Sequence, residues 1–577
     1  MAGDGADVEH VVAALPPRVS KPALQARGIR VGPPAAPPRP EPAPSGLDAV
    51  RTDSGYVLDS GKPLSQSILW ELQQRYYSAR GVDAWSSGEV PHYVTTNPTI
   101  AARYAELVFA SMRDHARLGL RGERQVVIEL GAGPGRFAFH FLRRLTALCE
   151  GMQWDHKFLY VMTDFAEENL SHWQTHPQLA PFFEAGLLDV ALFDVSKSEC
   201  LELRRSGETI APGDLAVPPC VIANYVFDVT KQELLYFGEN ELHPCRVTLV
   251  TQADPATSDI LTVLNGLRCE PEIEPASDPS YDVAEYNAIL TDYRAIIRRN
   301  YLFFPIGALD CLRRLRRLSP RGAIVLVADM GGYGMAGFTD APPLVHHGSI
   351  SFDLDFQALA RYCSAIGGLA LFPKHRHENI GVCALLAVDD ALAYKGFVTA
   401  FEENVGSFGP DDFFHVHTHV SRVLSGMTLQ DIVAYLRLGR YDCDLLARCL
   451  PQLWQMLPTF SDDDRSLVLE IVARCWDHHF AVGEQRDLAF DLGLFFYDLD
   501  DYEEALRFFG RSAELCGVHA GTLYNAAACC RRLGDEQEEL RLLRLFLASG
   551  VEDVVARERV LEIEAAAPSE EFAMDRN

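Results

Sequence analysis

Apolar and polar positions follow two different periods along the chain. Before residue 390, short apolar runs alternate with segments in which apolar residues recur every three or four positions. The runs predict buried strands, and the segments between them predict amphipathic helices that cover a sheet. After Asp390 only the helical period remains. The pattern therefore predicts an α/β domain followed by an all-α domain.

The apolar runs predict a mixed or parallel sheet of about seven strands. The clearest strands are 126–130, 157–164, 188–194, 219–224, 322–329 and 380–388. Helical spacing is found over 136–145, 167–175, 286–317 and 357–366. Strands and helices that alternate in this way are typical of a Rossmann-like fold. We assign this domain to residues 51–395.

Two segments of the α/β region lie outside this alternation. Order is expected to begin near Leu64, with helices over 67–77 and 100–113 before the first strand. The loop between these helices either folds over a ligand of the sheet or caps the sheet. Residues 239–279 are rich in acidic and turn-forming residues, which favours an irregular insertion over the active face.

The ends of the chain do not have the pattern of a packed core. Seven prolines lie within 31–44, so residues 1–50 are predicted to be disordered. This segment is either a plain linker or a ligand for a proline-reading domain. We also predict that the tail, 567–577, is disordered.

Composition excludes several classes of partner. A chain of 577 residues is too long for one core, so we expect more than one domain. A formal charge of −28 disfavours nucleic acid, whose phosphates would be repelled. No apolar run reaches the roughly 18 residues of a membrane span. The fourteen cysteines form neither a disulfide framework nor zinc-ligand spacing. We therefore expect a cytoplasmic protein with free thiols and no metal.

The strand at 126–130 leads directly into three alternating glycines. Gly131, Gly133 and Gly135 follow Glu129, and a helix begins near Arg136. Glycines allow a tight turn and close approach to a ligand, while the helix N-terminus presents N–H groups and its positive dipole end. In an S-adenosylmethionine (SAM) site these groups meet the methionine carboxylate, and Glu129 lies near the amino group or the sulfonium. This order fits a dinucleotide poorly.

Two further strands end in acids that fit the same ligand. Asp164 ends the second strand, next to Phe165, at the position that grips ribose hydroxyls, although it could instead cap a helix. Asp194 ends the third strand and would face the adenine amino group, with Phe193 or Val195 against the ring. Asp194 could equally begin a turn.

The fourth strand ends in polar residues. Asn224, Tyr225 and Asp228 lie where open α/β sheets carry out their chemistry, so we take them as candidate catalytic residues that orient or deprotonate a nucleophile. Loop capping is the alternative. Further along, Asp329 ends a strand and His346-His347 suggest a general base, but these residues lack metal-ligand spacing.

Several of these motifs together resemble the MidA-like SAM-dependent methyltransferases, which include the mitochondrial complex I assembly arginine methyltransferase. The resemblance covers about 60–390 and rests on the glycine loop, Ala223-Asn224, and the Asp-Leu-Asp-Phe-Gln-Ala-Leu sequence at 353–359. It implies a SAM site lined by Thr96, Asn97, Pro98, Gly131, Gly133, Asp164 and Asn224.

The chain departs from that family at two informative positions. Ala132 stands where the family usually has proline, and Tyr225 stands where it has an acid. The resemblance therefore supports SAM binding better than it supports arginine chemistry.

The C-terminal helical region contains an internal repeat. The windows 490–509 and 524–543 match at a period of 34, with a small residue followed sixteen positions later by a large apolar one. This pattern resembles tetratricopeptide repeats, which we assign to 486–566, with degenerate helical pairs at 396–485. Such an array usually binds a peptide or protein, but it could instead form a lid or a dimer contact.

Together these patterns predict a SAM-dependent methyltransferase that acts on a protein acceptor recruited with help from the helical repeats. Two alternatives stay open. The enzyme could methylate a small metabolite while the repeats serve assembly, or the SAM fold could be a catalytically silent scaffold that recruits partners.

Overall fold

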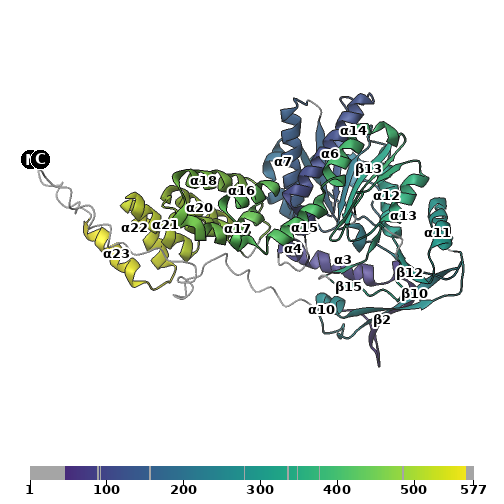
Figure 1. Ribbon diagram of the computed structural model, residues 1–577. Coiled ribbons are helices and arrows are strands. Elements are labelled where there is room, and N and C mark those ends of the chain that lie inside the picture. Colours follow the sequence, from purple (N-terminus) through teal and green to yellow (C-terminus); the bar gives the residue numbers. More distant parts are fainter. Residues whose placement is uncertain are drawn as a thin grey trace, which may run out of the picture. The chain divides into compact units, whose positions relative to one another are not determined.

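The computed structural model describes residues 46–566, except 87–89, 91, 155–156, 279, 334–336, 347–348, 376 and 484–485 (Figure 1). The disorder predicted for 1–45 and 567–577, and the side chain of His347, lie outside this range. The chain forms two compact units. The larger unit contains the described residues up to Leu446 together with Arg474–Val482. The smaller unit contains Ala447–Ala473 and the described residues from Gly483 onward.

The centre of the larger unit is a seven-stranded sheet, in agreement with the number predicted. In spatial order its strands are β18 (Leu369–Leu371), β19 (Gly381–Val388), β13 (Gly322–Asp329), β8 (Cys220–Asn224), β3 (Gln125–Leu130), β4 (Phe158–Asp164) and β5 (Leu188–Leu192). The strands from β13 to β5 run parallel. At one edge β19 runs antiparallel to β13, and the edge strand β18 is antiparallel to β19.

Helices cover both faces of this sheet, which explains its continuous apolar strands. Alternate side chains face opposite layers: Val127 and Met162 pack in one core, and Ile128 and Val161 pack in the other. The first layer contains α6 (Pro98–Arg117), α7 (Arg136–Gly151) and α14 (Lys395–Phe401). The second contains α11 (Ala284–Ile296), α12 (Ile306–Arg316) and α13 (Phe356–Ala365).

The order of the strands reverses beside β3. The chain passes from β3 to β4 and β5 on one side and returns to β8 on the other. In open α/β sheets the crevice at the carboxyl ends of the strands, next to such a reversal, is where ligands bind. This places the glycine turn after β3 and the polar residues after β8 at the same crevice.

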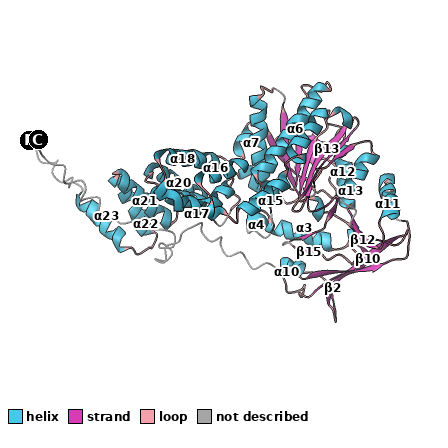
Figure 2. Cartoon of the chain, viewed as in Figure 1, coloured by secondary structure: helices cyan, strands magenta, loops and turns pink. Residues whose placement is uncertain are grey.

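A second sheet replaces the irregular insertion that was predicted at 239–279. Its antiparallel strands follow the order β1 (Val50–Thr52), β2 (Gly55–Pro63), β10 (Leu242–Thr251), β9 (Glu233–Phe237) and β12 (Asn300–Phe304), and β11 (Leu267–Ile273) pairs with β10. Figure 2 shows both sheets in magenta within the larger unit.

Three predictions are corrected by this sheet. The insertion is regular, and order begins before Leu64, at β1 and β2. The single helix predicted over 286–317 is instead α11, β12 and α12. One face of the sheet packs on α3 (Leu69–Arg80) around Leu72 and Leu249, while the other face is more exposed. Half-exposed strands contain many polar residues, so their apolar pattern is weak.

The helices that precede the first parallel strand agree with the prediction. Residues 67–77 fall largely in α3, and 100–113 fall within α6. Two short helices, α4 (Asp83–Ser86) and α5 (Tyr93–Thr96), lie between them. The remaining short elements are η1 (Leu64–Gln66), α8 (Glu167–Thr175), α9 (Ala180–Glu184), β6 (Leu201–Glu202), β7 (Thr209–Ile210), η2 (Phe227–Val229), α10 (Ile260–Asn265), β14 (Gly331–Gly332), β15 (Val345–His346), β16 (Ile350–Ser351) and β17 (Leu354–Asp355).

The larger unit extends past residue 395, where the domain boundary was predicted. Asp114 of α6 accepts hydrogen bonds from the backbone N–H groups of Gly396 and Phe397, at 3.2 and 2.8 Å. This contact ties α14 to the core of the α/β sheet. The helices α15 (Pro410–Val420) and α16 (Leu429–Leu438) follow in the same unit.

The described part of the smaller unit is helical. It contains most of α17 (Cys443–Met456) and α18 (Asp462–Trp476), followed by α19 (Leu488–Asp498), α20 (Tyr502–Cys516), α21 (Ala520–Leu533), α22 (Glu536–Ala548) and α23 (Val554–Ala566). The two repeat windows fall on the pairs α19–α20 and α21–α22. A Cβ on Gly493 would lie 2.6 Å from the Phe509 ring, so the small and large residues of the first window are in contact.

Among the helices that the structure describes, none has both the length and the apolar character needed to cross a bilayer.

Candidate cofactor and acceptor site

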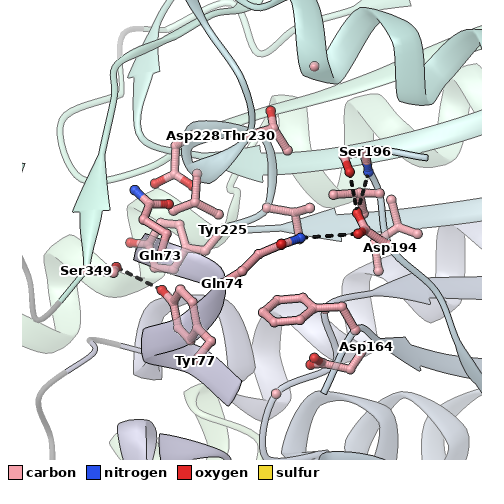
Figure 3. Close-up of a pocket in the computed structure, with 18 of the residues that line it drawn as sticks. Gln73, Gln74, Tyr77, Asp164, Asp194, Ser196, Tyr225, Asp228, Thr230 and Ser349 are labelled. Atoms are coloured by element: carbon pink, nitrogen blue, oxygen red, sulfur yellow. Dashed lines mark hydrogen bonds between the residues drawn. The ribbon is translucent and has the colours of Figure 1, made fainter. Parts of the chain in front are cut away.

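A cavity of about 730 Å³ lies at the carboxyl ends of the parallel strands (Figure 3). One part of its wall comes from the segments that follow β3, β4, β5 and β8. The rest comes from η1, α3 and the segments around 229–231, 306–307 and 349–351. The cavity therefore joins the crevice of the parallel sheet to elements that the second sheet positions.

The glycine turn lines this cavity with backbone. Gly131 and Gly133 have φ angles of +57° and +53°, which favour glycine, and both lie in the cavity wall. A Cβ on Gly133 would lie 3.2 Å from the indole ring of Trp85. Trp173 fixes the turn from behind, since its Nε1 donates a hydrogen bond to the Gly133 carbonyl at 2.9 Å. The turn is thus shaped so that a ligand can approach its backbone.

Gly135 has a different role from the one predicted. It is absent from the cavity wall, and it caps α7 with a φ of +85°. A Cβ there would lie 3.1 Å from Met162 and 3.2 Å from Trp173. The third glycine therefore allows the helix to pack closely on its neighbours.

The Thr96–Pro98 segment likewise contains one residue that lines the cavity and two that have a structural role. Thr96 lines the cavity, but Asn97 and Pro98 do not. The Asn97 side chain caps α6, accepting hydrogen bonds from the N–H groups of Thr99 and Ile100 at 3.0 and 3.2 Å. Pro98 occupies the first helical position. These two residues form the helix start that supports Thr96.

Glu129 is a buried carboxyl beside the turn. Burial raises its pKa to about 8, although a hydrogen bond from the Tyr160 hydroxyl, 2.9 Å away, acts in the opposite direction. The group also lines the cavity. A cation bound nearby would therefore favour the charged form of Glu129 and would be attracted by it.

Asp164 ends β4 and faces the same cavity. Burial raises its pKa to about 6, against the effect of hydrogen bonds that include one from the Ala166 N–H at 3.0 Å. The carboxyl therefore both shapes the turn into α8 and borders the cavity, which combines the two roles considered for it. Phe165 lies beside it in the cavity wall.

Asp194 follows β5, the strand next to β4, and also lines the cavity. The N–H and the Oγ of Ser196 donate to its Oδ1 at 2.8 and 2.6 Å, so the side chain begins a turn as one alternative proposed. Burial opposes its ionisation, but hydrogen bonds from Ser196 and Lys197 outweigh burial and lower the pKa of Asp194. Phe193 and Val195 line the cavity on either side of it.

The three candidate catalytic residues all line the cavity. The Nδ2 of Asn224 lies 3.4 Å from the Thr95 carbonyl. Tyr225 has a φ of +53°, which is unfavourable for a residue with a large side chain. Such strain is often found at functional sites, where the surrounding structure enforces it.

Asp228 is paired with a carboxyl that the sequence did not connect to it. Oδ2 of Asp329 accepts hydrogen bonds from the N–H groups of Phe227 and Asp228, at 2.9 and 3.4 Å. Burial and the neighbouring Asp228 raise the pKa of Asp329 well above its ordinary value, and burial raises the pKa of Asp228 to about 6. Of the two carboxyls, Asp329 therefore holds its proton more strongly, and the cavity-facing Asp228 ionises more readily.

Sequence reasoning also missed the contribution of α3. Gln73, Gln74 and Tyr77 line the cavity from this helix, and the Tyr77 hydroxyl donates to Ser349 Oγ at 2.8 Å. Figure 3 shows Gln74 reaching Asp194 and Tyr77 reaching Ser349. The repeated polar residues of α3 at 73 and 74, next to Tyr76-Tyr77, are the signal that could have identified it.

A buried ion pair holds the helix start that follows the glycine turn. Arg136, the first residue of α7, contacts Asp442 at 2.8 Å and Asp444 at 2.5 Å. Burial disfavours its charge, but the two carboxylates outweigh burial and raise the pKa of Arg136. The Tyr93 hydroxyl, at the start of α5, donates to Asp442 at 2.8 Å. Residues 442–444 thus fix the helix start on which the turn depends.

Comparison with known proteins gives structural similarity only. No family model matches the chain, and no curated protein is similar to it. A solved structure of an uncharacterised protein from Burkholderia thailandensis is 17% identical, with a TM-score of 0.36, over 58% of this chain and 90% of that one. A member of the same superfamily from that species, bound to S-adenosyl-homocysteine, is 17% identical, with a TM-score of 0.35, over 54% and 74%. The magnesium protoporphyrin IX methyltransferase of Synechocystis, also with bound S-adenosyl-homocysteine, is 8% identical, with a TM-score of 0.26, over 54% and 96%.

Proposed function

We propose that this chain is a SAM-dependent methyltransferase of the MidA-like type. One observation carries the proposal: a glycine turn and three strand-end acids, Glu129, Asp164 and Asp194, border a single cavity at the point where the strand order reverses. The sites for the methionine end, the ribose and the adenine would follow one another along successive strand ends.

The residues present fit this cofactor. Gly131 and Gly133 line the cavity without side chains, which allows a methionine carboxylate to approach the backbone N–H groups of the turn. Glu129 matches a cationic group, Asp164 matches two hydroxyls, and apolar Phe165 and Val195 match a planar ring. When bound, SAM supplies an electrophilic methyl group on a sulfonium.

The protein's contribution is mainly positioning. Holding a nucleophile in line with the methyl group contributes up to about 7–11 kcal/mol in favourable systems. Asn224 and Tyr225 orient the acceptor, and Asp228 accepts its proton. Because Asp329 holds its proton more strongly than Asp228, it stabilises the charge on Asp228 without competing for the acceptor's proton.

We further propose a protein acceptor in the cytoplasm, recruited with help from the helical pairs of the smaller unit. The helix pairs α19–α20 and α21–α22 support this reading, since stacked pairs of this kind present a surface for peptides. A small-metabolite acceptor is the second candidate. The size of the cavity favours this candidate. Its 730 Å³ falls within the range of sites that enclose a whole small molecule, and a site for only the end of a protein side chain needs less volume.

Ligand-induced stabilisation tests the cofactor. SAM and S-adenosyl-homocysteine, at about 100 times Kd, should each raise the melting temperature of the full chain by several degrees. NAD and ATP should not, since neither has the amino-acid end that the glycine turn accommodates. Stabilisation by NAD alone would replace the methyltransferase assignment with a dinucleotide site.

Transfer of a labelled methyl group tests the acceptor. Purified chain and labelled SAM are added to a cell lysate, and the products are precipitated with acid. Label in the precipitate supports a protein acceptor, and label that stays soluble supports a small metabolite. Cofactor binding without any transfer would favour the catalytically silent scaffold.

A further inference from the structure

Gln74 already donates a hydrogen bond to Asp194, the carboxylate that the adenine amino group would use. Its Nε2 donates to Oδ2 of Asp194 at 3.1 Å, across the cavity from α3 (Figure 3). The two residues are 120 positions apart in the sequence, so the contact joins separate elements. Gln74 is exposed and makes this bond from the cavity rim.

The Asp194 carboxylate has no acceptor position to spare. Two carboxylate oxygens offer about four lone-pair positions. Oδ1 receives the N–H and the Oγ of Ser196, at 2.8 and 2.6 Å. Oδ2 receives Gln74 and the Lys197 ammonium, each at 3.1 Å. A new donor must therefore displace one of these four.

Gln74 is the donor that can be displaced at least cost to local structure. Ser196 belongs to the turn that Asp194 begins, so its bonds hold the turn itself. Lys197 offers a charged ammonium, which a neutral amino group does not replace. Gln74 comes from a different element, and water can solvate its amide once it leaves. A carboxamide N–H and an exocyclic amino N–H are also alike in chemistry, since both are neutral and planar donors.

We propose that the Gln74 carboxamide occupies the place of the cofactor's adenine amino group and is displaced when the cofactor binds. The inference rests on the proposed function, because it takes Asp194 as the adenine acceptor. Gln74 then sets affinity and selectivity: a ligand must carry a 6-amino donor to replace the bond that it breaks. One helical turn later, the Tyr77 hydroxyl contacts Ser349 and the Tyr77 ring centre lies 6.3 Å from that of Phe165, so the same helix contacts the residues that follow both β4 and β5.

Calorimetry on the full chain tests this displacement. The ligands are S-adenosyl-homocysteine and its analogue in which hydrogen replaces the 6-amino group. Gln74→Ala should tighten binding of S-adenosyl-homocysteine about three- to tenfold, as expected for loss of one competing hydrogen bond. It should leave the Kd of the analogue within about twofold, because the analogue does not displace Gln74.

Two further variants keep the result interpretable. Gln74→Met preserves side-chain length and removes the donor, so it should give the same gain as the alanine variant. Arg75→Ala, on the next and exposed residue of α3, should change neither Kd.

The outcomes separate this inference from the proposed function. If the wild type binds S-adenosyl-homocysteine but both Gln74 variants bind it equally or more weakly, the displacement is wrong and the cofactor assignment stands. If both ligands gain equally, Gln74 hinders entry without replacing the amino group, which also overturns the inference. If the wild type binds neither ligand, both proposals fall.

Discussion

At the scale of single residues, the proton balance of the cavity depends on two carboxyls that share one environment. Asp228 lines the cavity with a pKa raised to about 6, and Asp329 lies behind it with a pKa raised further by burial and by Asp228 itself. Tyr77 and Tyr225 border the same space, and burial keeps both phenols protonated by raising their pKa values. Asp228 is thus the group among these four that ionises most readily.

This arrangement predicts how the rate depends on pH. Because an acceptor's proton can pass only to ionised Asp228, kcat/KM should rise with pH through about 6 and then level off. Asp228→Asn should lower kcat about 100-fold or more and abolish this rise. The control is Asp310→Asn, which alters another carboxyl of the cavity wall. Equal losses in the two variants would remove the proton-accepting role from Asp228.

The location of residues that directly follow a strand could be predicted from the sequence. The residues that they contact in the fold could not. Asp164 and Asp194 come directly after apolar runs, so the fold alone places them at the crevice. Asp329 meets Asp228 only because β13 lies beside β8, with Ala328 opposite Asn224. Nothing in the local sequence specifies that neighbour, since the pairing depends on the spatial order of the strands.

At the scale of elements, helix starts position the cavity residues. α6 begins at Pro98 under the Asn97 cap, and the preceding α5 presents Thr95 and Thr96 to the cavity. The sequence Asn97-Pro98 correctly indicated a helix start. The family resemblance also implied that Asn97 contacts the cofactor, but the Asn97 side chain makes the hydrogen bonds that cap α6 instead. One polar side chain can satisfy both patterns, and only its partners distinguish them.

Substitution at Asn97 distinguishes a cap from a ligand contact. Asn97→Ala should lower the free energy of unfolding by about 1 kcal/mol, whereas Asn97→Ser should retain most of it. Urea denaturation measures both. The Kd for S-adenosyl-homocysteine should change by less than about threefold in the serine variant, because the cap is kept. A serine variant that is stable but binds tenfold more weakly would return Asn97 to the cofactor contacts.

The second sheet was the element least accessible to sequence reasoning. In β10, buried Val247 and Leu249 alternate with partly exposed residues, and β11 carries exposed charges. Turn-forming residues between such strands dominate the local composition. The parallel strands, buried on both faces, give the stronger pattern and were placed within a few residues.

At the scale of the whole molecule, the two units are interleaved along the chain. The larger unit includes Arg474–Val482, which follow residues of the smaller unit. His176 contacts this segment, since its Nε2 lies 2.8 Å from the Ala481 carbonyl and its ring stacks on Phe480 at 4.0 Å. A boundary based on sequence period alone, at 395, therefore misses both the extension to Leu446 and the return at 474–482.

The interleaving predicts the outcome of truncation. A chain ending at residue 482 keeps every segment of the larger unit and should bind S-adenosyl-homocysteine within about threefold of the full chain. A chain ending at residue 446 loses the contacts of Phe480 and Ala481, and should melt at a lower temperature. Calorimetry and thermal denaturation of the two truncated chains check this. Equal stability of both would show that the 474–482 segment contributes little.

The central claim is that the glycine turn holds SAM, and titration of the turn variants with S-adenosyl-homocysteine tests it most directly. The wild type should bind one equivalent. Gly133→Arg should abolish binding, because Gly133 has a φ of +53° and its Cβ position lies 3.2 Å from Trp85. Gly186→Arg is the matched control, with a φ of +68° and open space around its Cβ position. Binding that is retained in the control and lost in the Gly133 variant is the predicted result. A wild type that binds nothing, or a Gly133→Arg chain that binds as well as the wild type, would contradict it.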